Sequence, residues 1–187
     1  MSRKRKLQIS AGLVVMSAGI IFFWSVCSLP PIPPHRGDGQ FQDLSHRAGP
    51  FPLRGYNISM PDFDLGSPQR AEYRFAGLSN IGQHCGVYLA IRDEHRRWQG
   101  WADRKELDGG LSIELVDSQR KEVVRVSGRL GEFIWYGFDK VHALYKMDKS
   151  FFTPRTDEEY RLLFSYQPDA KLAGYKGYVY LECKQSM

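Results

Sequence analysis

The sequence predicts a mainly β protein: an antiparallel β-sandwich of about eight strands behind one N-terminal transmembrane helix. Two observations lead to this fold class. A basic flank is followed by a long uncharged run, and the chain from Leu53 onward consists of short segments in which apolar and polar residues alternate. Of the 187 residues, roughly 140 remain behind the anchor and its spacer, which is the usual size of one domain.

The first 29 residues are predicted to be a membrane anchor. Residues 1–6 form a basic flank, and the uncharged run of residues 7–29 would span about 34 Å as an α-helix, enough to cross a lipid bilayer. Because the basic residues all precede the run, we expect a cytoplasmic N-terminus and a domain in the periplasm or the extracellular space. A secretory signal peptide has a similar pattern, so a cleaved and secreted form is the alternative. The residues between Ser25 and Ser28 make a poor cleavage site, which favours the retained anchor.

Residues 30–50 are predicted to be a Pro-rich spacer between the anchor and the domain. They contain five prolines and little apolar periodicity, and the Pro-Pro pairs favour an extended polyproline II rod followed by a polar, flexible part. The tripeptide Arg36-Gly37-Asp38 matches an integrin-recognition sequence. Three residues often match by chance, and Gly and Asp are common in linkers, so we assign the tripeptide no function.

The net charge of +5 and the isoelectric point of about 9.1 mainly describe the basic flank. Residues 3–6 carry four of these positive charges, which leaves a net charge of +1 for the rest of the chain. That remainder has no concentrated basic tract of the kind that binds a phosphate backbone. We therefore expect no nucleic-acid partner.

Residues 51–187 are predicted to form the β domain. Eight segments of this range are rich in Val, Ile, Leu, Tyr and Phe, alternate with period two and end at turn-forming residues. They are residues 54–60, 71–75, 85–91, 111–117, 122–127, 133–136, 159–167 and 177–183. Segments of this length and spacing are typical of sandwiches of the jelly-roll, immunoglobulin-like or C2-like kind, and such a fold does not by itself assign a function.

The alternation also predicts which side chains face the core. One face of each clear segment is apolar, and we place it inside the sandwich. These faces are Val87, Leu89 and Ile91; Leu111, Ile113 and Leu115; Val124 and Val126; Val179 and Leu181; and an aromatic-rich row of Tyr160, Leu162, Phe164 and Tyr166. Residues 117–121 are expected to be the hairpin turn between two of these segments. Residues 140–149 have a weak helical spacing and are predicted to form one or two helical turns.

Two of the three cysteines are predicted to form a disulfide. Cys85 lies two residues before Val87 and Cys183 two residues after Leu181, so both cysteines are expected to face the core. Cys85 begins its predicted strand, whereas Cys183 ends its own. Neighbouring antiparallel strands bring the start of one beside the end of the other, and an exported domain meets oxidising conditions. The third cysteine, Cys27, lies in the anchor run. Two separate buried thiols that pack as small apolar groups are the alternative.

The candidate ligand site is an aromatic loop between two predicted strands. Trp98 and Trp101 lie three residues apart in a polar connection. Tryptophans in a loop are less readily buried in the core than tryptophans in a strand. Arg97 and Asp103 flank them and have groups that hydrogen-bond sugar hydroxyls. The candidate ligand-binding residues are therefore Arg97, Trp98, Trp101 and Asp103. Burial of the rings in a satellite core and a protein-contact surface are the alternatives.

No combination of residues predicts an enzyme or a cofactor. The sequence lacks G-x-S-x-G and H-E-x-x-H, and His84 and Cys85 point to opposite faces of a strand, which prevents a catalytic pair. His142 lies among aromatic residues, where packing is its expected role. Asp62 and Asp64 form a D-x-D pair of the kind that binds calcium, but turn-forming acids have the same pattern, so we name no metal ligand.

These observations predict a membrane-tethered, extracytoplasmic binding or interaction module without enzymatic activity. Its expected partners are the lipid bilayer, through residues 7–29, and an envelope protein or a glycan near the membrane surface. The tether would raise the local concentration of the domain for that partner. The alternative is recognition of carbohydrate or cell envelope through the loop tryptophans.

Overall fold

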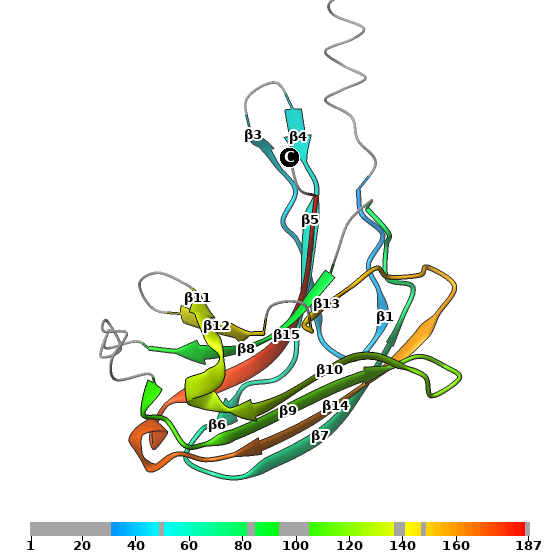
Figure 1. The fold of residues 1–187 in the computed structure, drawn as a ribbon. Coiled ribbons are helices and arrows are strands. Elements are labelled where there is room, and N and C mark those ends of the chain that lie inside the picture. Colours follow the sequence, from blue (N-terminus) through cyan, green and yellow to red (C-terminus); the bar gives the residue numbers. More distant parts are fainter. Residues whose placement is uncertain are drawn as a thin grey trace, which may run out of the picture.

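The computed structural model describes residues 31–48, 51–81, 85–93, 105–136, 141–146 and 149–185. These residues form two antiparallel sheets that pack on each other in a β-sandwich-like fold (Figure 1). The mainly β, antiparallel architecture predicted from the sequence is therefore confirmed. Within the described residues, no helix has the length and apolar character needed to cross a membrane. The anchor predicted for residues 7–29 lies outside them.

The first sheet has five strands in the order β1-β7-β14-β9-β10. Its strands are β1 (Arg36–Gly37), β7 (Gln69–Ala76), β14 (Glu159–Gln167), β9 (Gly110–Val116) and β10 (Glu122–Arg129). The β9–β10 hairpin closes through the predicted turn, where the Asp117 carboxylate accepts hydrogen bonds from the backbone N–H groups of Gln119 (3.0 Å) and Lys121 (2.8 Å). Arg120 completes the turn with a φ of 61°, in the left-handed region.

The second sheet follows the order β11-β12-β8-β15-β5-β2. Its strands are β11 (Ile134–Tyr136), β12 (Val141–Tyr145), β8 (Cys85–Arg92), β15 (Lys176–Lys184), β5 (Gly55–Ser59) and β2 (Gln40–Asp43), with β13 (Phe151–Phe152) also paired to β8 and β6 (Phe63–Asp64) to β15. A separate hairpin of β3 (His46–Ala48) and β4 (Phe51–Leu53) extends away from the sheets next to β5 (Figure 1). The described residues also include two short 3₁₀ helices, η1 (Leu130–Glu132) and η2 (Ala170–Leu172).

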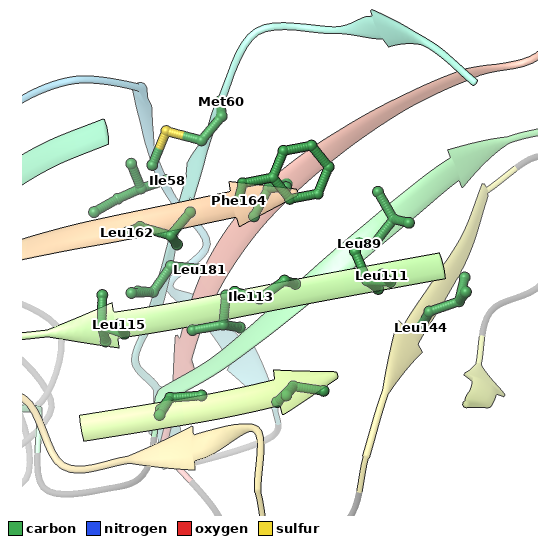
Figure 2. Packing of buried hydrophobic residues seen from close by; sticks show 14 of the residues in the cluster. Ile58, Met60, Leu89, Leu111, Ile113, Leu115, Leu144, Leu162, Phe164 and Leu181 are labelled. Carbon is green, nitrogen blue, oxygen red and sulfur yellow. The ribbon is translucent and has the colours of Figure 1, made fainter. Parts of the chain in front are cut away.

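The core lies between the two sheets, where the predicted apolar faces meet (Figure 2). Leu162 comes from the first sheet, Leu89 and Leu181 come from the second, and all three are fully buried. Every residue of the predicted apolar rows is buried, which confirms the side-chain parity of these strands. Burial of this apolar surface supplies the main driving force for folding.

Cys85 and Cys183 form the predicted disulfide. They lie directly opposite each other, at the start of β8 and near the end of β15, with their Cα atoms 4.1 Å apart. Both residues are fully buried on the core side of the sheet. The bridge therefore joins two central strands and closes a loop between positions 98 residues apart.

The helical turns predicted for residues 140–149 are wrong, because Val141–Tyr145 forms strand β12. This strand pairs with both β8 and β11. His142 and Leu144 point to the core, whereas Tyr145 lies on the outer face against aromatic neighbours. A strand that packs on both faces lacks a clean polar side, and strand pairing overrides the weak helical spacing of such a segment.

The strands begin earlier in the chain than residue 51, the predicted start of the domain. Ile32 is 3% exposed and belongs to the core, β1 pairs with β7 and β2 pairs with β5. Much of the range expected to be a spacer therefore contributes to the sandwich. These strands carry no apolar alternation, because an edge strand such as β2 exposes most of its side chains.

Candidate functional site

The residues predicted to bind a ligand, Arg97, Trp98, Trp101 and Asp103, lie outside the described residues. In this part of the chain the described residues end at Asp93 and resume at Lys105. An aromatic platform in this loop therefore stays a prediction. The described residues instead present another aromatic surface, on the outer face of the second sheet.

Six aromatic side chains form this surface, which we call the tyrosine patch. Its members are Tyr136 (β11), Tyr145 (β12), Tyr88 (β8), Phe151 (β13), and Tyr178 and Tyr180 (β15). In β8 and β15 the residues on either side of Tyr88 and Tyr180 point to the core, so the tyrosines point outward. Tyr136 is 62% exposed and Phe151 39%, and among the described residues they are the most exposed large apolar side chains.

The rings of the tyrosine patch support one another across strands. Tyr88 and Tyr180 are opposite each other in register and stack with 5.0 Å between their centroids and 17° between their planes. Tyr145 and Phe151 meet the Tyr88 ring edge-on, at centroid distances of 5.8 and 6.3 Å. Cross-strand pairs of this kind contribute roughly 0.2–1 kcal/mol each and restrict the rotation of the rings. The patch is therefore preformed.

Small residues beneath the patch let the rings lie close to the sheet. A side chain at Gly86 would collide with the Tyr88 hydroxyl, so glycine is required for the Tyr88 ring to lie along its strand. Ala90 and Ala143 are neighbours in register and lie between the tyrosines of β15 and β11. Ala90 is 0% exposed and Ala143 6%. This outer face thus has the mixture of large and small side chains that is typical of a packed layer.

The patch is uncharged at neutral pH and has ionic groups at its margin. Burial raises the pKa of Tyr88, Tyr178 and Tyr180 above the ordinary phenol value, so their hydroxyl groups stay protonated. The Arg92 guanidinium lies 4.5 Å from the centroid of the Tyr178 ring and forms an ion pair with Asp62 at 3.2 Å. The surface therefore offers apolar area and neutral hydroxyl groups next to a charged pair.

The outer face of the first sheet differs in kind. Its outward positions are mainly charged or polar, and ion pairs connect them. These pairs are Arg74 with Glu72 (2.9 Å), Arg161 with Glu72 (3.8 Å) and Arg125 with Glu114 (3.0 Å). Such surface pairs contribute only about 0–1 kcal/mol each, as expected of a face that meets water. In the part of the chain that the structure describes, an aromatic cluster covers only the outer face of the second sheet.

The acidic residues considered for calcium have partners within the fold. Asp62 is held by the ion pair at the margin of the patch, and the Asp64 carboxylate accepts a hydrogen bond from the Gly66 backbone N–H at 2.8 Å. A further acidic residue, Asp93, follows β8, is fully buried and lies 3.5 Å from Nε2 of His142. Over the described ranges, no three His, Cys, Asp or Glu side chains gather in a way that would hold a metal ion.

His142, which the sequence places among aromatic residues, packs inside the sandwich. It is 4% exposed, and its ring centroid lies 6.1 Å from that of Trp135. This position agrees with the packing role expected for it. The other histidine weighed for catalysis, His84, lies outside the described residues.

The Arg36-Gly37-Asp38 tripeptide has a structural role. Arg36 and Gly37 form β1, and Gly37 has a φ of 111° at a position where a side chain would collide with the Arg74 carbonyl. The Asp38 carboxylate accepts a hydrogen bond from the Arg74 N–H at 2.7 Å, and the Asp38 N–H donates one to the Arg74 carbonyl at 2.7 Å. The tripeptide therefore holds the start of the domain against β7 through strand pairing and hydrogen bonds.

No protein-family model matches the chain, and no curated protein matches it. The function is therefore inferred from the site, because a β-sandwich is compatible with many functions. The tyrosine patch is not among the sites predicted from the sequence, although the alternation that places Val87 and Leu89 in the core also places Tyr88 outside. The sequence feature that indicates the patch is the presence of tyrosines at outward strand positions, where a face that meets water would have polar residues.

Proposed function

We propose that the chain is a membrane-tethered, extracytoplasmic interaction module that binds a protein partner through the tyrosine patch and catalyses no reaction. The observation that carries this proposal is the asymmetry of the two outer faces. A sheet face that meets only water is expected to be polar, as that of the first sheet is. Packed aromatic side chains on the other face favour a surface that is covered when the protein works.

A protein partner fits the patch better than a sugar does. Tyrosine is enriched in protein interfaces, because its ring supplies apolar contact area and its hydroxyl supplies a hydrogen bond. A sugar needs a free ring face on which to stack, but Tyr88 and Tyr180 turn their faces toward each other. The exposed members Tyr136 and Phe151 are the ones that a partner would contact first.

The tether and the compartment are supported by the N-terminal sequence and by the disulfide. Residues 7–29 are long enough for one transmembrane helix. The Cys85–Cys183 bridge favours an oxidising compartment outside the cytoplasm, where such bonds persist. A domain held at a membrane surface meets its partner at a raised effective concentration, so a patch of modest affinity is sufficient.

Site-specific photocrosslinking tests the tyrosine patch. We expect a photoreactive phenylalanine analogue at Tyr136 to give a discrete protein adduct in cells that express the full chain. The same analogue at Arg74, on the outer face of the first sheet, should give none. Adding Tyr145→Ser to the Tyr136 probe should reduce the adduct, because it removes a ring of the patch and leaves the core intact. Equal adducts from both faces, or none from Tyr136, would contradict the proposal.

Recognition of carbohydrate or cell envelope through Trp98 and Trp101 is the alternative function. It is supported by the sequence alone, in which two tryptophans lie three residues apart in a polar loop. Glycan-array binding by the full chain that disappears in the double variant Trp98→Ala/Trp101→Ala, but persists in Tyr136→Ser, would favour this alternative.

A further inference from the structure

A second surface lies at the free edge of the first sheet. β10 is the last strand of this sheet: it pairs with β9 on one side, and no strand of the described residues pairs with its other side. A pocket of about 370 Å³ lies along this free side, near the lower end of the range for ligand sites. Its lining residues are Glu122, Val123, Val124, Arg125 and Ser127 of β10, together with Lys149 and Phe151.

The backbone of β10 at Arg125 faces this pocket. The Ser127 carbonyl accepts a hydrogen bond from the Lys146 ammonium at 2.7 Å, so the backbone groups of Ser127 point away from β9. Residues two apart in a strand direct their N–H and C=O groups to the same side, so those of Arg125 also point away from β9. Lys146 covers the Ser127 position, and a bulge between Glu122 and Val124 interrupts the start of the strand. The free hydrogen-bonding edge is therefore short and centred on Arg125.

The side chains around the pocket favour a ligand with one acidic and one apolar group. Arg125 forms ion pairs with Glu114 at 3.0 Å and with Glu122 at 2.9 Å, so its charge is already compensated. Lys149 is exposed, and among the described residues it has no carboxylate partner. Phe151 is 39% exposed and supplies apolar area. The pocket thus combines one available ammonium group with one available aromatic ring.

We propose that this edge binds an extended peptide segment of a protein partner, which adds to β10 as a short strand. The N–H and C=O groups of Arg125 pair with the peptide backbone, Phe151 contacts an apolar side chain, and Lys149 pairs with a carboxylate. A second copy of the chain is a poorer occupant, because β10 aligned with itself at Arg125 would place two guanidinium groups opposite each other. The site shares Phe151 with the tyrosine patch, whereas its other two binding groups, the Arg125 backbone and the Lys149 ammonium, lie outside the patch.

Selection from a library of linear peptides on the purified full-length chain tests the site. The selected peptides should share an apolar residue near an acidic one. Arg125→Pro removes the outward N–H and no ladder bond to β9, so it should weaken binding by about tenfold or more. The matched control, Arg125→Ala, keeps the N–H and should bind as the original chain does. Lys149→Ala should weaken the binding of acidic peptides and leave that of their amide analogues unchanged.

Backbone amide resonances of the original chain give a readout that does not require the proline variant to fold. Bound peptide should shift the Arg125 amide and slow its hydrogen exchange, with no change in β1 at the opposite edge. The proposal is overturned if no peptide is selected, if Arg125→Pro binds as Arg125→Ala does, or if the chain dimerises through β10. Peptide binding that persists in Tyr136→Ser separates this site from the tyrosine patch.

Discussion

The tyrosines of this chain have two roles, which depend on the direction in which each strand turns the side chain. Tyr56 is 1% exposed and Tyr166 0%, and their hydroxyl groups donate hydrogen bonds to the carbonyls of Ser79 (3.0 Å) and Leu65 (2.9 Å). A hydroxyl buried without a partner costs free energy, so these bonds allow tyrosine to occupy core positions. The outward tyrosines instead pack on one another and build the proposed binding surface.

Tyr166→Phe should lower the free energy of unfolding by about 1–2 kcal/mol at neutral pH, because the Leu65 carbonyl loses its hydrogen bond inside the core. Burial raises the pKa of Tyr166. Above about pH 10 the unfolded chain therefore releases this phenolic proton while the folded chain keeps it. The stability that neutral Tyr166 contributes is present below that pH and is lost as the pH rises, so the difference between the two proteins should shrink in alkaline solution.

Urea unfolding at neutral pH and above about pH 10 measures both effects of the Tyr166 substitution. Tyr136→Phe is the control, because the Tyr136 ring is 62% exposed and its substitution should leave stability unchanged at neutral pH. A Tyr166→Phe protein as stable as the original at neutral pH, or a difference that grows with pH, would contradict the assigned role.

At the scale of the element, strands with two unlike faces are predictable from this sequence and other strands are not. β14 has the predicted bounds, Glu159–Gln167, because its inward residues alternate with more exposed ones along the whole strand. Residues 140–149 are predicted to be helical because Val141, Leu144 and Tyr145 have a weak helical spacing. In β12 the outward Ala143 is as well buried as the inward His142, so the strand has no polar face that would reveal it. β1 and β2 are not predicted from the sequence, because edge strands carry mostly polar side chains, and neither strand pairs with the strand that follows it in the chain.

The disulfide should be the strongest single constraint on the central strands β8 and β15. The double variant Cys85→Ala/Cys183→Ala should lower the free energy of unfolding by about 4–5 kcal/mol, because it releases a loop between positions 98 residues apart in the unfolded chain. Alanine at both sites avoids a single buried thiol. Cys27→Ala, in the predicted anchor, is the control and should not change the unfolding of the domain.

Urea unfolding with and without reductant checks the disulfide prediction. Reductant should destabilise the original chain and the Cys27→Ala control by similar amounts and should have no effect on the double variant. Equal stability of the double variant and the original chain would mean that the bridge closes a loop that is already restricted in the unfolded state.

At the scale of the whole molecule, the candidate surface depends on strand order, which the sequence does not reveal. Tyr88, Tyr145 and Tyr180 come from segments far apart in the chain and meet only because β12, β8 and β15 are neighbours. Alternation determines whether each tyrosine points inward or outward, but the same parities fit many strand orders. The loop site predicted from the sequence depends on a local pair, Trp98 and Trp101, whereas the tyrosine patch forms only in the tertiary fold.

Topology mapping tests where this fold is displayed. A reporter enzyme that is active only outside the cytoplasm, fused after Met187 in a bacterial host, should be active and should remain in the membrane fraction, because residues 7–29 are retained as the anchor. Glutamate in place of the basic residues 3–6 should lower the reporter activity, because positive charge on the cytoplasmic side sets the orientation. A shorter, soluble and active fusion would establish the cleaved form. An inactive fusion would contradict export altogether, and it would place Cys85 and Cys183 in a reducing compartment where their disulfide does not persist.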